Sequence, residues 1–178
     1  MEDIFYKRLE LNDIAFPLFD RFNRYQNVTR CWRKENDKWF LKDIAFTEQW
    51  DETEYHYLVG CLKNTILTDG AVFGAFCNSY LVGFASVERL PLGSMQEYVQ
   101  LSSIHTSQES RGRGIGKVLF NMACTIAKEF GATKLYISAH SSEETQAFYR
   151  IMGCAEAKEY NNKLVEEEPC DCQLEYVL

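Results

Sequence analysis

The segment 111–131 constrains the fold more than any other part of the chain. A turn rich in glycine and basic residues, "SRGRGIGK", leads directly into an apolar pattern that continues to Phe130. Apolar residues recur there at i, i+3, i+4 and i+7, which predicts an amphipathic helix that begins near Ile115 and ends at Gly131. Because segment 97–106 has the apolar pattern of a strand, we expect a strand, a glycine turn and a helix in succession.

This glycine turn predicts a phosphate-binding site. The N-terminus of a helix presents unpaired backbone N–H groups and a partial positive charge. Glycine lets a bulky anion approach the backbone closely, and Arg111, Arg113 and Lys117 add full positive charges. Two familiar phosphate motifs are excluded, because a P-loop requires Ser or Thr where Val118 stands and the dinucleotide fingerprint requires Gly or Ala where Leu119 stands.

The overall composition favours a small-molecule partner. A net charge of −7 opposes general affinity for nucleic acid or anionic membranes, so a nucleic-acid contact by the Arg-Gly-Arg stretch is a weaker alternative. A purely structural turn is also weaker, because three glycines exceed what a turn needs. No segment approaches the roughly 18 consecutive apolar residues of a membrane span. The acidic start "MEDIFYKRLE" is unlike a signal peptide, so we expect a cytoplasmic protein. The seven scattered cysteines predict reduced thiols, and no metal site is expected.

The remaining patterns predict a single α+β domain over residues 1–178, with strands at both ends and helices between them. Further helices are expected from Asn12 or Asp13 to about Arg24, from a capping box at Asp51 and Glu54 to Asp69-Gly70, and from a capping box at Ser141 and Glu144 to about Gly153. Strands are expected at 5–11, as two short strands around the turn 34–38, and at 71–76, 80–88, 97–106, 133–139, 154–160 and 171–178, with an acidic loop before the last.

The sequence R-x-x-G-x-G at 111–116 resembles the pyrophosphate-binding signature of the GNAT family of N-acetyltransferases. The stretch "LSSIHTSQESRGRGIG" is similar to that family's fourth strand and coenzyme A loop, and "SSEETQAFYRIMGC" to its later helix, with Ser142, Thr145 and Cys154 where the family often has Asn, Ala and Phe. The resemblance is close from Glu97 to Ala155. It implies a central twisted, mostly antiparallel sheet with helices on both faces, splayed between the fourth and fifth strands to admit acetyl-CoA.

The resemblance also implies roles for individual residues. Acetyl-CoA would donate its acetyl group to the primary amine of a small molecule or peptide. The backbone N–H of Ile104 would stabilise the developing oxyanion, and Tyr149 would protonate the departing thiolate. Coenzyme A would be held by Ile104, Thr106, Arg111, Gly112, Arg113, Gly114, Ile115, Gly116, Lys117, Ser142, Thr145 and Phe148.

The sequence does not identify the general base. Ser102 stands where many family members have a carboxylate, and serine cannot act as a base unaided. The candidates are Glu88, Glu97, His105 and a water chain through Ser102 or Ser103. A non-catalytic acyl-CoA-binding or sensing module of the same fold is therefore the alternative to an enzyme.

The acceptor is equally open. We expect its pocket to be formed by the first helices, Trp32, Trp39, the segment 43–57 and the C-terminal strands. Acidic residues that could favour a cationic amine, or be ordinary solvated charge, are Asp43, Glu48, Asp51, Glu52, Glu54, Glu166, Glu167 and Glu168. A small-molecule amine, a polyamine, an aminoglycoside, a peptide N-terminus and a protein lysine are all compatible with the sequence, as is a homodimer.

Overall fold

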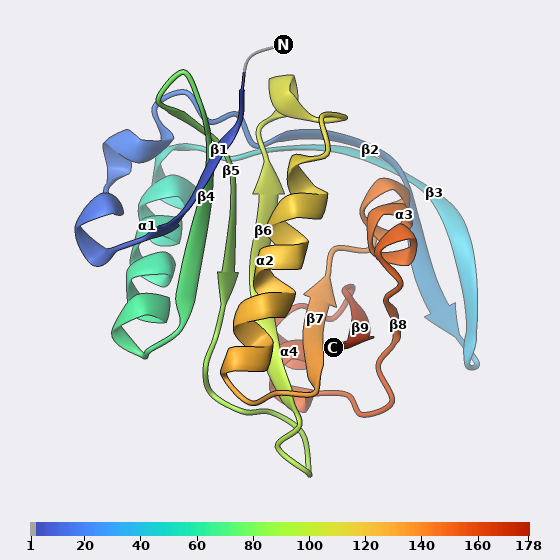
Figure 1. The fold of residues 1–178 in the computed structure, drawn as a ribbon. Helices are drawn as coiled ribbons and strands as arrows, with labels where there is room; N and C mark the ends of the chain where they lie inside the picture. Colours follow the sequence, from blue (N-terminus) through green and yellow to red (C-terminus); the bar gives the residue numbers. More distant parts are fainter. Residues whose placement is uncertain (1–2) are drawn as a thin grey trace.

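A computed structural model describes residues 3–178, which form a seven-stranded sheet in the order β1-β4-β5-β6-β7-β9-β8 and a separate two-stranded sheet, β2-β3 (Figure 1). The strands are β1 (Phe5–Leu9), β2 (Tyr25–Glu35), β3 (Lys38–Gln49), β4 (Ala71–Cys77), β5 (Tyr80–Val87), β6 (Tyr98–Thr106), β7 (Lys134–Ala139), β8 (Ala155–Glu156) and β9 (Cys172–Val177). In the larger sheet, β6 pairs with β7 in parallel and the other neighbours are antiparallel. The predicted mostly antiparallel α+β sheet is confirmed.

Helices cover both faces of this sheet, as expected. The larger ones are α1 (Glu52–Leu67) and α2 (Ile115–Glu129), followed by α3 (Glu143–Met152) and α4 (Asn162–Glu167). Successive residues of β4 point to opposite faces, because Val72 lies in the core that includes Leu62 of α1, and Phe73 lies in the core that includes Leu119 of α2. No helix within residues 3–178 is long and apolar enough to cross a membrane.

Three predicted elements form almost as expected. The capping box of α1 is complete, since the Asp51 carboxylate accepts from the backbone N–H of Glu54 and the Glu54 carboxylate accepts from that of Asp51. Helix α2 follows the apolar pattern from Ile115, and Gly131 follows its end with φ of 85°. The hairpin of β4 and β5 turns at Asn78 and Ser79, whose φ angles of 48° and 68° fit a tight two-residue turn.

The parallel pairing of β6 with β7 is short, and this determines where the site lies. Residues 98–100 pair with residues 134–136, after which the two strands separate. Beyond that point β6 continues beside β5 as far as Thr106, and β7 continues beside β9 as far as Ala139. The sheet is therefore splayed at its centre, as the sequence predicts.

The helix expected to run to about Arg24 is absent. Two short 3₁₀ helices, η1 (Leu11–Asp13) and η2 (Phe16–Phe19), take its place. Pro17 lies in the first turn of η2, where it lacks the N–H that a continuing helix would need. The ring of Phe19 packs edge-on against Phe84 in the core under α1, so aromatic burial replaces helical periodicity in this segment.

The strands β2 and β3 are much longer than the two short strands expected. They meet at Asn36 and Asp37, whose φ angles of 51° and 60° suit a two-residue hairpin turn. The hairpin reaches across to the start of α3, where the backbone N–H of Trp32 donates to the carbonyl of Ser141 over 2.8 Å (Figure 1). One side of the splayed sheet thereby gains an additional wall.

The C-terminal third departs from expectation at two points. Ser142 caps α3 in place of Ser141, since the Ser142 hydroxyl accepts from the N–H of Thr145 over 3.3 Å. The Ser141 hydroxyl instead accepts from Arg33 of β2 over 2.6 Å. The strand expected over 154–160 shortens to β8, and the acidic loop contains α4. Strand β9 forms as predicted and lies inside the sheet, between β7 and β8.

Candidate active site

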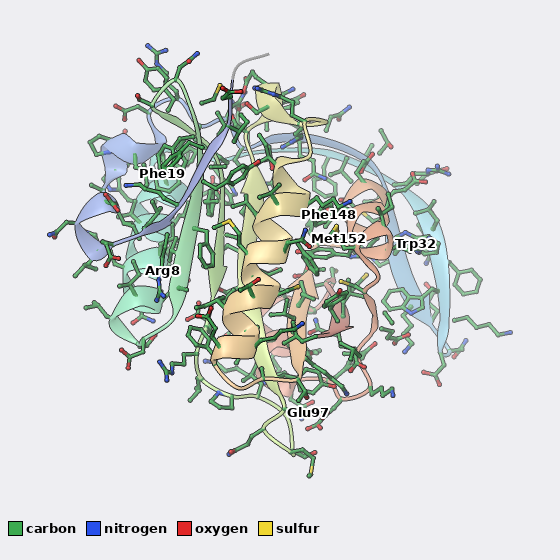
Figure 2. The ribbon with its side chains drawn as sticks, in the orientation of Figure 1. Arg8, Phe19, Trp32, Glu97, Phe148 and Met152 are labelled. Atoms are coloured by element: carbon green, nitrogen blue, oxygen red, sulfur yellow. The ribbon has the colours of Figure 1, made fainter. Side chains whose placement is uncertain are left out.

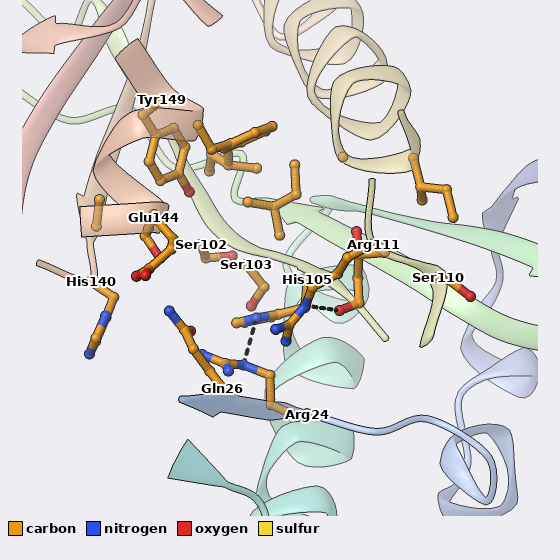
Figure 3. A pocket seen from close by; sticks show the side chains of 18 of the residues that line it. Arg24, Gln26, Ser102, Ser103, His105, Ser110, Arg111, His140, Glu144 and Tyr149 are labelled. Atoms are coloured by element: carbon orange, nitrogen blue, oxygen red, sulfur yellow. Dashed lines mark hydrogen bonds between the residues drawn. The ribbon is translucent and has the colours of Figure 1, made fainter. Parts of the chain in front are cut away.

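A cavity of about 480 Å³ opens where β6 and β7 separate (Figure 3). Residues 101–106 of β6 form one wall, and the end of β7 with the start of α3 forms another. The turn before α2 and the residues Arg24 and Gln26 complete the lining.

Most of the predicted coenzyme A residues line this cavity, namely Ile104, Thr106, Arg111, Gly112, Ile115, Gly116, Thr145 and Phe148. The others, Arg113, Gly114, Lys117 and Ser142, are not part of its lining. Ser142 is fully buried, and its hydroxyl accepts from the Gln26 side chain and donates to the Thr145 hydroxyl, both over 2.9 Å. Ser142 therefore supports the wall and does not reach the cavity.

The turn before α2 has the backbone that the sequence predicts for an anion site. Gly112 and Gly114 have φ angles of 75° and 78°, which glycine adopts without strain. Gly114 is the N-cap of α2, and no side chain within residues 3–178 caps that end of the helix. At Gly116 an added Cβ would lie 3.2 Å from the Phe148 ring, so glycine allows α2 to approach α3 closely.

The three cations of the turn are placed differently. The Arg111 side chain lies between β6 and β2, where Nη2 donates to the carbonyl of Tyr25 over 2.5 Å and Nε to that of Thr106 over 3.3 Å. Arg113 extends toward Cys77, with Nη1 4.0 Å from the sulfur, and Lys117 is exposed. Only Arg111 of the three belongs to the cavity wall.

The backbone of β6 leaves one edge directed at the cavity. The N–H of Ser107 donates to the carbonyl of Val82 on β5. Since hydrogen-bonding direction alternates along an antiparallel strand, the backbone groups of Ile104 and Thr106 face away from β5, on the side from which β7 has separated. These are the two positions that the sequence predicts to contact the donor.

Tyr149 is buried in α3 and lines the cavity, and Figure 3 shows its hydroxyl directed into the space between Ser102 and Glu144. Burial raises the pKa of Tyr149 above its ordinary value, and the nearby Cys154 contributes in the same direction. The phenol is therefore neutral throughout the physiological range, and it is a weaker acid than an ordinary tyrosine.

Ser102 is linked directly to a carboxylate. Its hydroxyl donates to Glu88 Oε1 over 2.6 Å and lies 2.8 Å from the hydroxyl of Ser86. The same Glu88 oxygen accepts from Thr65 over 2.7 Å. Ser102 lies where the register between β5 and β6 shifts, so this irregularity directs its side chain toward both Glu88 and the cavity.

The other two candidates for the base are placed unfavourably. Glu97 lies at the end of the sheet opposite the glycine turn, where its carboxylate accepts from Lys134 over 2.9 Å (Figure 2). His105 lines the cavity, but its Nδ1 accepts from Arg24 Nε over 3.1 Å. Burial, together with the Arg24 charge, lowers the pKa of His105 to about 3, so it accepts a proton poorly at neutral pH.

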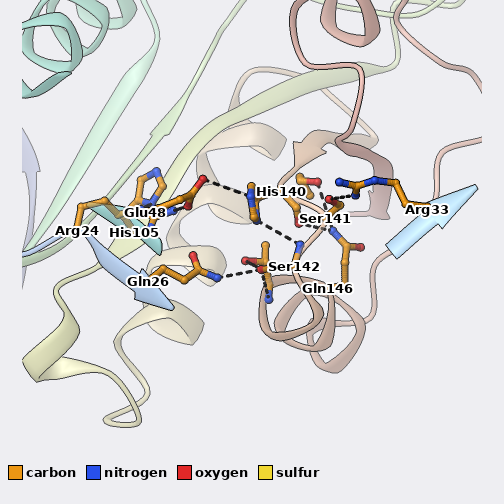
Figure 4. Close-up of polar contacts among 11 residues, drawn as sticks. Arg24, Gln26, Arg33, Glu48, His105, His140, Ser141, Ser142 and Gln146 are labelled. Carbon is orange, nitrogen blue, oxygen red and sulfur yellow. Dashed lines mark hydrogen bonds and ion pairs between the residues drawn. The ribbon is translucent and has the colours of Figure 1, made fainter. Parts of the chain in front are cut away.

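A polar cluster beside the cavity was not identified from the sequence (Figure 4). Arg24 is buried, and its Nη2 donates to Glu48 Oε2 over 3.0 Å. The other Glu48 oxygen lies 3.3 Å from Nε2 of His140. The hydrogen bond to His140, followed by the Arg24 charge, lowers the pKa of Glu48 below its usual value. Arg24 directly precedes β2, Glu48 lies in β3 and His140 directly follows β7, and no local motif connects them.

The two tryptophans expected at the acceptor lie elsewhere. Trp32 and Trp39 line a second cavity of about 210 Å³ between the β2-β3 hairpin, α3 and β8. Figure 2 shows Trp32 beside α3. There the Arg150 guanidinium lies 5.3 Å from the Trp32 ring centre, and Trp39 Nε1 donates to Glu156 over 3.0 Å. Of the expected acidic residues, Glu48 adjoins the main cavity through Arg24 and His140, and the others are not part of its lining.

Comparison with known proteins gives the family. A model of the acetyltransferase (GNAT) family matches residues 25–154, which is well over half of the chain. The chain therefore belongs to the GNAT acetyltransferase family, and the resemblance seen in the sequence is confirmed. A search of curated protein sequences finds no significant match.

Solved structures confirm the fold. A nourseothricin acetyltransferase is 18% identical, with a TM-score of 0.67 over 97% of this chain and 95% of that one. A Bacillus anthracis protein described as a streptothricin acetyltransferase, in complex with acetyl coenzyme A, is 14% identical, with a TM-score of 0.72 over 99% and 97%. The PaiA N-acetyltransferase of Thermoplasma acidophilum, in complex with coenzyme A, is 15% identical, with a TM-score of 0.60 over 99% of each chain.

Proposed function

We propose that this protein transfers the acetyl group of acetyl-CoA to the primary amine of an acceptor, by direct attack in a ternary complex. The observation that carries the proposal is the cavity at the splayed centre of the sheet. It joins the glycine turn at the start of α2 to a phenol, Tyr149, and to a hydroxyl–carboxylate pair, Ser102 and Glu88. Membership of the GNAT family supports the same reaction.

The residues present fit acetyl-CoA. The first-turn N–H groups of α2 would hold the pyrophosphate, because glycines at 112 and 114 allow close approach and no side chain within residues 3–178 occupies that helix end. The outward backbone groups of Ile104 and Thr106 would pair with the amides of the pantetheine arm as an added strand would. Arg111, which is held by two carbonyls, would border the donor from the β2 side.

The acceptor amine must lose a proton as it attacks. In our proposal the nitrogen–carbon bond forms while that proton passes, directly or through one water, to the Ser102 hydroxyl, whose own proton moves to Glu88. The hydrogen bond of 2.6 Å between Ser102 and Glu88 supports this relay. Serine at the position of the family's carboxylate is then compatible with catalysis, because the carboxylate lies one hydrogen bond further away.

Charge that develops on the thioester carbonyl oxygen needs a donor, and the Ile104 N–H is our candidate. One such donor contributes about 3 kcal/mol of transition-state stabilisation. As the carbon–sulfur bond breaks, Tyr149 would supply a proton to the sulfur. Its place in the cavity wall, with the hydroxyl directed into the open space, supports this role.

The proposal is tested first by ligand binding and then by turnover. We expect CoA at one hundred times its Kd to stabilise the fold by about 2.7 kcal/mol, with little effect of NAD or ATP. Thermal unfolding at increasing ligand concentrations measures this. Free-thiol release from acetyl-CoA with a panel of primary amines then separates an enzyme from an acyl-CoA sensor of the same fold. No thermal shift with CoA would contradict the proposal, and a shift without thiol release for any amine would favour the sensor.

A further inference from the structure

We infer that the acceptor amine carries a carboxylate group, and that Arg24 is the residue that binds it. The inference rests on the proposed function and names the substrate class for the same cavity. It excludes simple polyamines, which carry no anionic group, from the preferred acceptors.

The first observation is an unpaired donor on a buried cation. Only 9% of the Arg24 side chain is exposed. Its Nε donates to His105 and its Nη2 to Glu48, but Nη1 is buried and has no hydrogen-bond partner among residues 3–178. Buried polar groups in folded proteins are nearly always paired. Since Arg24 is one of the residues that line the cavity, its unpaired Nη1 indicates a missing acceptor.

The second observation is the charge around that nitrogen. Arg24 and Arg111 both line the cavity, where Arg24 Nε donates to His105 and Arg111 Nε donates to the carbonyl of the next residue, Thr106. His105 itself is neutral, because burial, together with the Arg24 charge, lowers its pKa to about 3. Glu48 pairs directly with Arg24 over 3.0 Å, whereas the Arg111 side chain donates to two backbone carbonyls and forms no ion pair within residues 3–178.

The chemistry that fits such a wall is a carboxylate. A guanidinium donates in a planar fork that matches the two oxygens of a carboxylate, and the pairing is strongest where water is excluded. The opposite wall is different, because Glu144 lines it with an exposed carboxylate, next to Tyr149 and Ser102 (Figure 3). A molecule with a carboxylate at one end and an amine at the other would place its amine near the proposed relay.

The test compares acceptors that differ only in this charge. β-Alanine is paired with β-alaninamide, and L-lysine with L-lysinamide, so that size is kept while the negative charge is removed. Binding to the wild-type protein saturated with CoA is measured by calorimetry. We expect each carboxylate to bind at least about tenfold more tightly than its amide, because a buried polar site rejects an analogue that leaves it unpaired. Equal or tighter binding of the amides, or no binding of either carboxylate, would overturn the inference.

A variant assigns the preference to Arg24. Arg24→Gln keeps a donor for Glu48 but loses the positive charge, and we expect the carboxylate-to-amide preference to fall to about one. Arg30→Gln is the matched control, because Arg30 is an arginine of β2 with an exposed ion pair to Glu143 and no part in the cavity lining. An unchanged preference in Arg24→Gln would also overturn the inference. If that variant does not fold, the wild-type comparison alone decides.

Failure of this inference can be distinguished from failure of the proposed function. Thiol release with amines that lack a carboxylate, at the same efficiency as with their carboxylated counterparts, would retain the acetyltransferase and reject the role of Arg24. Absence of CoA binding would reject the acetyltransferase itself.

Discussion

Ser102 and Glu88 share one short hydrogen bond, and we expect their removal to have non-additive effects. Ser102→Ala and Glu88→Gln should each lower kcat by about 10²–10⁴-fold, the range that general acid–base catalysis contributes. The double variant should lose little more than either single variant, since both act through the same proton path. Steady-state kinetics with any accepted amine measures this cycle.

Glu97→Gln provides the control for that cycle, because Glu97, like Glu88, is a glutamate next to the end of a strand, but it pairs with Lys134 outside the cavity. Its kcat should stay within about twofold of the wild type. Fully additive losses for Ser102→Ala and Glu88→Gln would mean that the two residues act independently, and the relay would be wrong.

Tyr149→Phe tests the acid. The substitution keeps the ring and its volume, so packing in α3 should change little. In the proposed mechanism the hydroxyl acts as the thioester breaks, so we expect kcat to fall by 10²-fold or more, or by about tenfold if water competes, with CoA affinity unchanged. Kinetics and a direct CoA titration are both required. Tyr176→Phe is the matched control, because Tyr176 packs against Phe120 and is not part of the cavity lining.

A loss of CoA affinity in Tyr149→Phe equal to the loss in kcat would instead make Tyr149 a binding residue. A kcat within about twofold of the wild type, with thiol release rate-limiting, would mean that solvent supplies the proton.

At the scale of elements, the turn before α2 is sensitive at Gly114. Its φ of 78° is unfavourable for a β-branched residue, and an added Cβ meets no described atom within 4 Å, so the strain is in the backbone alone. Gly114→Val should cost about 1–2 kcal/mol of stability without unfolding the protein, and should abolish stabilisation by CoA. Chemical denaturation with and without CoA measures both effects.

The control for the turn is the same substitution in α1. Gly60 has open space around its Cβ position, and valine is a better helix former than glycine. Gly60→Val should therefore leave CoA binding intact and stability unchanged or slightly raised. If Gly114→Val still gains full stabilisation from CoA, the turn does not hold the pyrophosphate.

The elements also show what a sequence can predict. Helix α2 was predicted because its apolar period, its glycine turn and its terminal glycine all lie within one segment. The helix before Arg24 was wrongly predicted, because polar caps at Asn12 or Asp13 suggested a start that Pro17 and the buried aromatic rings override. Local patterns report local structure, and tertiary burial decides where they are ambiguous.

The candidate site also contains residues that a local motif predicts and residues that it does not. The family-like motif gave Tyr149, the β6 backbone positions and the turn, because these lie within one contiguous stretch. The hydrogen-bond partners lie far away in the sequence. Glu88 is 14 positions from Ser102, and Arg24 is 81 positions from His105. Neither pairing has a signal in sequence spacing, because the tertiary fold brings these side chains together.

For the whole molecule, we expect the free energy of unfolding to depend on pH through two groups, His105 and Asp171, whose pKa values are shifted in opposite directions. Burial, with Arg24, lowers the pKa of His105 to about 3, so its contribution to stability is fully present above pH 6.5 and is lost as the pH falls toward 3. Burial, with Glu168, raises the pKa of Asp171 to about 6. Its contribution is present below about pH 3.8 and is lost as the pH rises through 6.

Asp171→Asn separates these two contributions. The amide can still accept the hydrogen bond that Ser138 donates, but it carries no buried charge. We expect the variant to gain on the order of 1 kcal/mol over the wild type at pH 8 and nothing at pH 4, after allowance for partial solvent exposure. Denaturant unfolding from pH 4 to pH 8 measures the difference. A gain that is equal at both pH values would mean that Asp171 does not titrate in this range.

The position of β9 inside the sheet has a consequence for biosynthesis. Strand β8 is made before β9 but pairs with it, and β7 gains its second neighbour only when β9 arrives. A ribosome adds about 5–20 residues per second, so the nascent chain exposes the open edge of β7 for seconds after the first strands have emerged. During that interval one wall of the cavity at the splayed centre of the sheet lacks its support, and the open edge of β7 is exposed to pairing with other strands.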